Sequence, residues 1–264
     1  MKRFRLELTF DGKRYSGWQK QADARTIQGS LLSAAAGLWG GEPDAQGNGR
    51  TDAGVHGLRY TAHLDVPFSG KAGEIRAQLN SVLPHDITVL SAAVASPHFH
   101  ARHNCLGRSY LFQLDQGRSV FRRHYAWQTG PLNLAAMREA AASYAGMHDF
   151  TAFTDRQAIK NKSPLAMINQ VGLEPFGDLL LFRVVGSHFL WKMVRRMVGV
   201  LVAVGRGEMP PGMVARLLAG PAEGLPNLSR LTAPAHGLFF EQAFYDQESM
   251  ERFLASSPLG PDFY

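Results

Sequence analysis

The segment Gly49–Val66, GRTDAGVHGLRYTAHLDV, joins a glycine-rich loop to an alternating strand pattern. From Leu58 onward every second residue is apolar, which predicts a half-buried β-strand. In the loop, Asp52 lies two residues after Arg50 and four residues before His56. A lone aspartate among glycines most often caps a turn. The cation and the histidine beside Asp52, on a loop held by a strand, favour a functional carboxylate instead.

The segments around this strand mix helical and strand periodicity without strict alternation of the two. Residues 4–10 alternate again and predict a strand, and Thr26 caps a predicted helix that stops at Gly40-Gly41. The stretch 175–178, Pro-Phe-Gly-Asp, separates two apolar runs as a hairpin signal, and residues 188–204 predict a long, mostly buried helix. This order of elements predicts an α+β fold with a largely antiparallel sheet.

The composition limits the class of protein. The 264 residues include 28 Lys and Arg against 22 Asp and Glu, so the formal net charge is +6, which suits either a polyanionic partner or a merely soluble basic protein. Cys105 is the one cysteine, so an internal disulfide is excluded and a reducing compartment is favoured. The most apolar stretch, 189–204, is interrupted by Lys192, Arg195 and Arg196, and cannot supply the roughly 20 apolar residues of a membrane span. We expect a cytoplasmic protein with no membrane partner.

Arg195 is a second candidate for a functional site. On a helix over 188–204 it shares a face with apolar or small residues, namely Trp191, Val198, Gly199 and Val202. A guanidinium in a packed interface needs an anionic partner, because burying it alone is very costly. Asp52 is the natural partner, and such a pair would keep Asp52 ionised. The alternative is that Arg195 extends its charged end to water.

Tyr110 and several basic residues suggest contact with RNA. Tyr110 lies on a predicted strand over 108–115, on the same face as Phe112. An aromatic ring beside basic residues can stack on an extruded base, although two core aromatics on a buried face are the alternative. Basic residues with aromatic residues between them predict a positively charged surface that binds the RNA backbone. The candidates for contact with the RNA backbone are Arg122, Arg123, Lys162, Lys192 and Arg196.

A histidine-rich segment raises the alternative of a metal site. His98, His100 and His103 fall within six residues, but no second group of ligands accompanies them. We therefore interpret the segment as a polar surface loop and expect no metal.

These segments together resemble the TruA family of tRNA pseudouridine synthases over nearly the whole chain. The hallmark catalytic segment of that family is present as residues 49–56. The other matching motifs are Phe10-Asp11-Gly12, Tyr15, Gly17-Trp18-Gln19, Thr26-Ile27-Gln28-Gly29, Phe99-His100-Ala101-Arg102 with Arg108 and Tyr110, Asp149-Phe150-Thr151-Ala152-Phe153, Met193-Val194-Arg195 and Gly237-Leu238-Phe239.

The resemblance implies a fold and a reaction. It implies two similar α/β halves with antiparallel sheets around a basic central cleft, which we place at 1–105 and 106–264. A seam at 117–130, a stretch rich in arginine and aromatic residues, is the alternative. The resemblance also implies a homodimer that isomerises uridine to pseudouridine at nucleotides 38, 39 and 40 of the tRNA anticodon stem-loop, without cofactor or metal.

The resemblance also assigns roles to individual residues. Asp52 is the essential carboxylate, which either attacks the ribose or base or removes a ribose proton. Tyr110 stacks on the target uracil, and Arg195 pairs with Asp52. The other residues implied to contact the substrate are Arg50, which fills the space left by the flipped nucleotide, Leu238, which packs beside the base, His56 and Arg108.

One departure from the family pattern concerns substrate choice. An Arg-Thr-Pro-x-Arg pattern is common in the family, and the matching segment here, 162–166, is Lys-Ser-Pro-Leu-Ala. Lys162 retains one charge, although lysine does not replace a bidentate arginine, and Ala166 removes the second charge. This leaves open an RNA-binding relative without isomerase activity. A metal-dependent hydrolase built from Asp52, His56 and the histidine segment is a third, weaker hypothesis.

Overall fold

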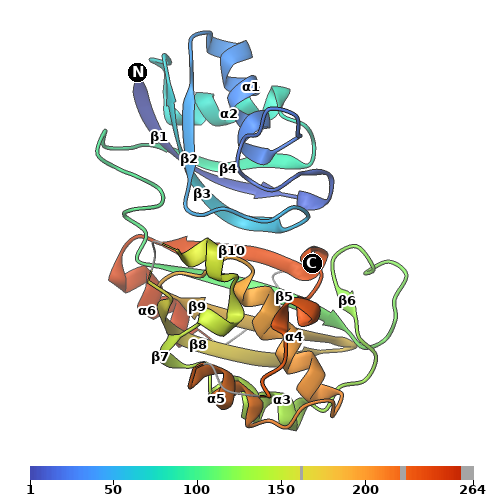
Figure 1. Cartoon of the computed structure of the whole chain (residues 1–264). Coiled ribbons are helices and arrows are strands. Elements are labelled where there is room, and N and C mark those ends of the chain that lie inside the picture. The colour runs from blue at the N-terminus through green and yellow to red at the C-terminus, as the bar shows by residue number, and fades with distance from the viewer. Residues whose placement is uncertain (161–162, 221–223, 257–264) are drawn as a thin grey trace. The chain divides into compact units, whose positions relative to one another are not determined.

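The computed structural model describes residues 1–160, 163–220 and 224–256 and divides the chain into two compact units (Figure 1). The N-terminal unit comprises Met1–Leu106 and Phe239–Asp246, and the C-terminal unit comprises Gly107–Leu238 and the residues from Gln247 onward. The sequence places one boundary after residue 105 and gives no sign that residues 239–246 return to the N-terminal unit.

The N-terminal unit contains a sheet, two α-helices and one short 3-10 helix. Its strands are β1 (Lys2–Phe10), β2 (Asp44–Gly47), β3 (His56–Val66), β4 (Ile87–Val94) and β10 (Leu238–Phe244), and its helices are η1 (Gly12–Arg14), α1 (Ile27–Trp39) and α2 (Ala72–Val82). The order β4-β1-β3-β10, with β2 also paired to β3, is antiparallel except between β10 and β3. The strands predicted at 4–10 and 58–66 and the helix after Thr26 are confirmed.

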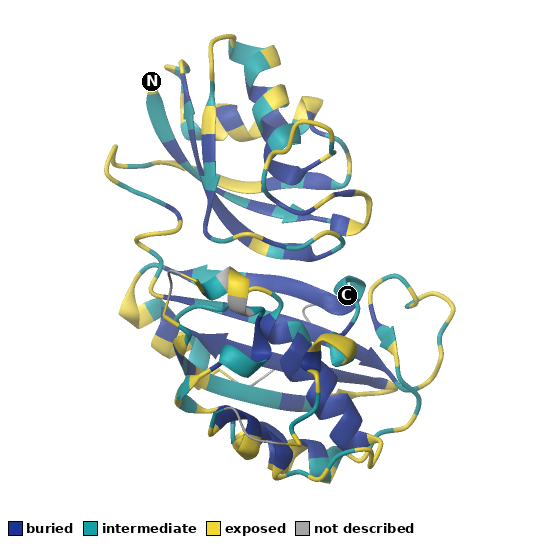
Figure 2. Cartoon of the chain, in the orientation of Figure 1, coloured by how far each residue is buried: buried dark blue, intermediate teal, exposed yellow. Residues whose placement is uncertain are grey.

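Alternating apolar residues build the core of this unit. Phe4, Leu6 and Leu8 are fully buried, and Leu6 lies opposite Ala62 in the β1–β3 register (Figure 2). Helix α1 begins where it does because the Thr26 hydroxyl accepts a hydrogen bond from the backbone N–H of Gly29 at 3.2 Å. The unit thus provides a rigid sheet on which the loop that carries Asp52 is mounted.

The C-terminal unit also contains largely antiparallel strands together with helices. Its strands are β5 (Gly107–Asp115), β6 (Trp127–Gln128), β7 (Gly146–Asp149), β8 (Leu165–Phe176) and β9 (Leu179–Gly186). Its helices are α3 (Leu134–Ala142), η2 (Thr151–Phe153), η3 (Arg156–Ile159), α4 (Met193–Gly205), α5 (Met213–Leu218), η4 (Leu228–Leu231), η5 (Ala235–Gly237) and α6 (Gln247–Ala255). The order β5-β9-β8-β7 is antiparallel, and the short β6 runs parallel to β5. The predicted α+β class and the hairpin at 175–178 are confirmed.

Helix α4 corrects one prediction. The sequence predicts a helix over 188–204, but α4 begins at Met193 because Lys192 adopts the left-handed conformation, with φ 59°. Trp191 therefore lies outside the helix and is exposed, so it does not share a helical face with Arg195. In the described part of the chain, no helix is long and apolar enough to cross a membrane.

Candidate active site

The loop that carries Asp52 is fastened to the segment that follows β1. The backbone N–H of Trp18 donates to the carbonyl oxygen of Thr51 at 3.3 Å, and that of Gly54 donates to the carbonyl of Tyr15 at 3.3 Å. The Tyr60 hydroxyl, from β3, donates to the carbonyl of Gly49. Asp52 is half-buried at the turn of this loop. These bonds therefore fix the backbone on both sides of Asp52, while the residue itself is not fully enclosed.

Two glycines allow the two backbone segments to approach so closely. A Cβ atom on Gly12 would lie 1.9 Å from the carbonyl oxygen of Val55, and one on Gly17 would lie 2.3 Å from that of Thr51. Gly17 also has a φ of 86°, which L side chains rarely adopt. Any side chain at either position would displace the Asp52 loop.

His56, the first residue of β3, holds the end of this loop through contacts with its neighbours. The side chain is only 2% exposed, its Nδ1 lies 3.0 Å from a carboxylate oxygen of Asp11, and its ring stacks on that of Phe239 at 4.7 Å. The backbone N–H of Gly12 lies 3.2 Å from the same Nδ1. The sequence suggested direct contact with substrate, but burial among Asp11, Gly12 and Phe239 instead indicates that His56 positions the loop.

Arg50 and the residues of β5 retain the exposure that their predicted roles require. Arg50 is exposed on the Asp52 loop. Tyr110 is half-buried on β5, opposite Val184, with its ring edge-on to Phe189 at 5.1 Å. On the same strand, Arg108 donates to the carbonyl of Ser187 at 2.7 Å. The contact with Phe189 therefore restricts the orientation of the Tyr110 ring.

Arg195 lies in the first turn of α4 and is half-buried. Its Nε donates to the carbonyl of Ala233 at 2.7 Å, and the N–H of Ala233 donates back to the carbonyl of Arg195 at 3.1 Å. This double contact fixes the direction of the guanidinium. Leu238, five residues after Ala233 and the first residue of β10, is buried, with 5% of its surface exposed.

The five residues predicted to contact the RNA backbone have different surroundings. Arg123 is exposed, and Lys192 lies with its ammonium 4.0 Å from the centre of the Trp191 ring. Arg196 is only 3% exposed and forms an ion pair with Asp155. Its assignment to phosphate contact is corrected, because the guanidinium is buried and is already paired with the carboxylate of Asp155. Lys162 lies outside the described residues.

Arg122 is corrected for the same reason. Its guanidinium donates to the fully buried carboxylate of Asp115 at 2.8 Å. A second carboxylate, that of Asp178, lies 3.6 Å away. Neutralising a buried aspartate is a structural role, and it leaves Arg122 poorly suited to bind phosphate.

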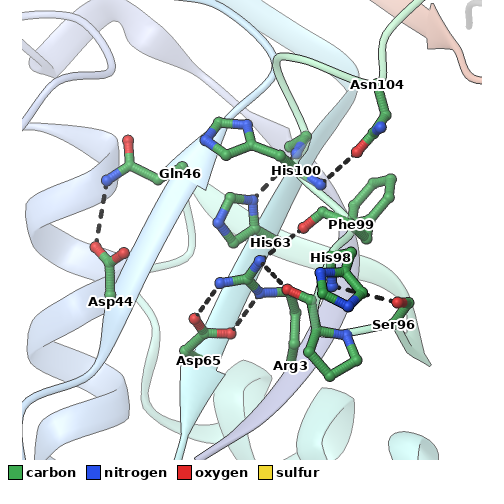
Figure 3. Close-up of polar contacts among 12 residues, drawn as sticks. Arg3, Asp44, Gln46, His63, Asp65, Ser96, His98, Phe99, His100 and Asn104 are labelled. Atoms are coloured by element: carbon green, nitrogen blue, oxygen red, sulfur yellow. Dashed lines mark hydrogen bonds and ion pairs between the residues drawn. The ribbon is translucent and has the colours of Figure 1, made fainter.

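The histidine segment is held by its own backbone contacts (Figure 3). Arg3 pairs with Asp65 at 2.8 Å and donates to the carbonyl oxygens of Pro97 and Phe99 at 2.7 and 2.9 Å. The N–H of Ala101 donates to Nδ1 of His63 at 3.1 Å. Burial, helped by the charge of Arg3, lowers the pKa of His63 to about 4, so its ring is neutral and can accept this bond.

The ring of His100, which is half-buried, also accepts a backbone hydrogen bond: its Nδ1 accepts from the N–H of Arg102 at 3.1 Å. The exposed His98 contributes through its backbone, whose N–H donates to the hydroxyl of Ser96 at 3.2 Å. Within the described ranges, no group of three or more His, Cys, Asp or Glu side chains is placed to hold a metal ion.

Comparisons with known proteins identify the family of this chain. A family model described as tRNA pseudouridine synthase matches residues 140–246. The tRNA pseudouridine synthase A of Maridesulfovibrio salexigens is 37% identical, over 94% of this chain and 92% of that protein. Those of Zymomonas mobilis and an Exiguobacterium species are 38% and 35% identical, over 93% and 94% of this chain and 100% and 99% of theirs. Among solved structures, a Cbf5–Nop10–Gar1 complex matches with a TM-score of 0.31 and 13% identity, over 76% of this chain and 54% of that one.

Similarity over nearly the whole length defines an isomerase of the pseudouridine synthase class. The chain belongs to the TruA family of tRNA pseudouridine synthases.

Proposed function

We propose that this protein isomerises uridine to pseudouridine at nucleotides 38, 39 and 40 of the tRNA anticodon stem-loop, with Asp52 as its catalytic carboxylate. The observation that carries the proposal is the clamped loop: Asp52 is half-buried on a turn fixed by Trp18, Gly54 and Tyr60. A reactive group works best when its surroundings hold it in place before the substrate arrives.

The reaction needs no external oxidant or reductant. The bond between ribose C1′ and uracil N1 breaks, a bond between C1′ and C5 forms, the proton on C5 leaves and N1 gains a proton. An ionised Asp52 can serve either of the two paths left open, attack on the ribose or base, or removal of a ribose proton. We propose that Arg195 is the cation that keeps Asp52 ionised in the working enzyme.

The target nucleotide must leave its stack before the carboxylate can reach it. Swinging a base out of a stem costs a few kcal/mol. We propose that Tyr110 offsets this cost by stacking on the uracil, that Arg50 fills the vacated space and that Leu238 packs beside the base. Arg108, two residues before Tyr110 on β5, is proposed to contact the same nucleotide.

The proposal is tested with unmodified tRNA transcripts and chemical mapping of pseudouridine at each position. Product at nucleotides 38–40 supports it. Salt-sensitive binding of tRNA with no product would instead support the RNA-binding relative that the altered segment 162–166 suggests. In that segment Ala166 is fully buried, opposite His148 on β7, so the small residue is part of the packed sheet.

Replacing Arg195 by methionine should lower kcat by at least about tenfold while changing the affinity for tRNA little, because an ion pair to Asp52 acts on the reaction and not on binding. Turnover and equilibrium binding are measured on the same preparations, and Arg216→Met, at an exposed position of α5, is the matched control. Equal losses in kcat and affinity would contradict the assignment.

Substitutions at Tyr110 should rank by whether they keep the ring. Tyr110→Phe preserves the stacking face and should retain most activity, whereas Tyr110→Leu should lower kcat/KM by about tenfold or more, since stacking contributes about 1–3 kcal/mol per base. Steady-state kinetics on one tRNA transcript check the order. The opposite ranking would show that the hydroxyl, and not the ring, matters.

We also propose that the protein is a cytoplasmic homodimer, as its resemblance to the TruA family implies. Sedimentation of the purified protein at several concentrations tests the dimer.

A further inference from the structure

The loop between β5 and β6, residues 116–126, consists mostly of exposed and half-buried residues (Figures 1 and 2). Phe121 is 89% exposed, Val120 is 66% exposed and Tyr125 is 40% exposed. Phe121 is the most exposed of the large apolar side chains in the described part of the chain. Single exposed apolar residues are common, but three within six residues call for a partner that covers them.

The loop is nevertheless held in a fixed shape. The carboxylate of Asp115, which is fully buried at the end of β5, accepts from the N–H of Gly117 at 3.1 Å and that of Ser119 at 2.9 Å, and from Arg122 at 2.8 Å. The side-chain amide of Gln128 donates to the carbonyl of Ser119 at 2.9 Å. These contacts fix both ends of the loop.

Fixing the loop has a consequence for binding. Because the contacts of Asp115 order residues 117–122 in advance, little conformational entropy is lost when the exposed tip meets a partner. Arg118 even adopts the left-handed conformation, with φ 55°, which is uncommon for a residue other than glycine. The surrounding contacts thus present Phe121 outward.

The charge of the loop indicates the chemistry of the partner. Its sequence, QGRSVFRRHYA, contains three arginines and a histidine but no carboxylate. Arg122 is occupied by Asp115, whereas Arg118 and Arg123 are exposed on either side of Phe121. Arginine beside an exposed aromatic ring is the combination that binds phosphates and unpaired bases together. A second copy of this basic chain would offer less charge complementarity, because its net charge is +6.

We propose that the β5–β6 loop is an RNA-contacting surface separate from the Asp52 loop, in which Phe121 stacks on an unpaired base and Arg118 and Arg123 contact the neighbouring phosphates. This inference rests on the proposed function only in taking the RNA to be tRNA. It assigns the loop to substrate binding and not to the chemical step.

Two substitutions of Phe121 test the stacking. Phe121→Leu keeps an apolar side chain without a ring and should weaken the binding of a tRNA transcript about tenfold, whereas Phe121→Tyr should bind like the wild type. Melting temperatures should be unchanged, because the side chain is 89% exposed. Val94→Ser, at an exposed apolar position outside the loop, is the control and should leave binding unchanged.

A charge substitution tests the phosphate contacts. Arg123→Gln should lower the slope of log Kd against log salt concentration by about one, which corresponds to the loss of one phosphate contact. Arg216→Gln, at an exposed position of α5, should leave that slope unchanged.

The outcomes separate this proposal from the proposed function. Unchanged affinity in Phe121→Leu would overturn the loop proposal, even if pseudouridine still forms. Loss of self-association in Phe121→Leu, with tRNA affinity intact, would show that the loop is an interface between protein chains and would also overturn it. A third outcome is that the wild type forms no pseudouridine but Phe121→Leu still weakens tRNA binding. This would support the loop proposal and reject the proposed function.

Discussion

Asp52→Asn should abolish pseudouridine formation while tRNA binding stays within about twofold of the wild type. The amide keeps the shape of the side chain but can neither accept a proton efficiently nor act as an anionic nucleophile. Positioned acid–base groups contribute about 10²- to 10⁴-fold, so the loss should be at least a hundredfold. Single-turnover assays with saturating enzyme measure it, because they separate chemistry from binding.

The control for this substitution is Asp23→Asn, at an exposed position of the same unit. It removes the same charge and should leave turnover unchanged. If Asp52→Asn and Asp23→Asn were equally active, the catalytic carboxylate would have to be sought elsewhere in the chain.

Among the substitutions proposed for this protein, Asp115→Ala should cause the largest loss of stability. We expect it to lower the free energy of unfolding by about 3 kcal/mol. It leaves the N–H groups of Gly117 and Ser119 without their acceptor and Arg122 without its closest carboxylate. Removing one partner of a buried pair destabilises by about 3–5 kcal/mol, and we take the lower end because Arg122 is 31% exposed. Urea unfolding measures the change.

Asp178→Ala is the matched control, since this side chain is 69% exposed and lies 3.6 Å from the same guanidinium. It should cost less than about 1 kcal/mol, as exposed ion pairs do. Similar losses for Asp115→Ala and Asp178→Ala would show that the buried carboxylate does not hold the loop.

The same carboxylate predicts a dependence of stability on pH. Burial alone would raise the pKa of Asp115, but the hydrogen bonds from Arg122, Gly117 and Ser119 outweigh it and lower the pKa below its ordinary value of 3.8. Its stabilisation is therefore fully present above that value and is lost as the pH falls through the lower pKa of the folded state. The difference in stability between wild type and Asp115→Ala should shrink in that acid range.

Local patterns in the sequence predicted much of the fold. The alternation of Phe4, Leu6 and Leu8 specifies a strand, because its period of two matches the pleat of a sheet. The turn chemistry of residues 175–178 likewise specifies a hairpin between neighbours in the chain. Both signals lie within about ten residues, where periodicity carries information.

Features that depend on distant contacts could not be predicted in this way. The pairing of β10 with β3 joins Phe239 to His56, and nothing local marks two segments so far apart as partners. The left-handed turn at Lys192, which delays α4, also gives no signal, because lysine has no preference for that conformation.

The candidate site shows the same division. The sequence indicated Asp52 through its immediate neighbours, and it indicated Tyr110 and Arg195 through their places on a predicted strand and helix, before the family resemblance was considered. It assigned Arg196 to phosphate contact, but that side chain is buried and paired with Asp155, whereas Arg195 is half-buried against Ala233. Adjacent arginines look alike until the packing of both helix faces is known.

The pairing of β10 with β3 has a consequence for synthesis on the ribosome. Residues 1–106 emerge first, but the strand that carries Phe239 and Phe240, the ring partners of His56 and Tyr60, is translated more than 130 residues later. In the nascent N-terminal half, the edge of β3 that pairs with β10 therefore lacks this partner until almost the whole polypeptide has been made. Messages truncated before codon 239 should yield products that are readily degraded, even though they encode every residue of the Asp52 loop.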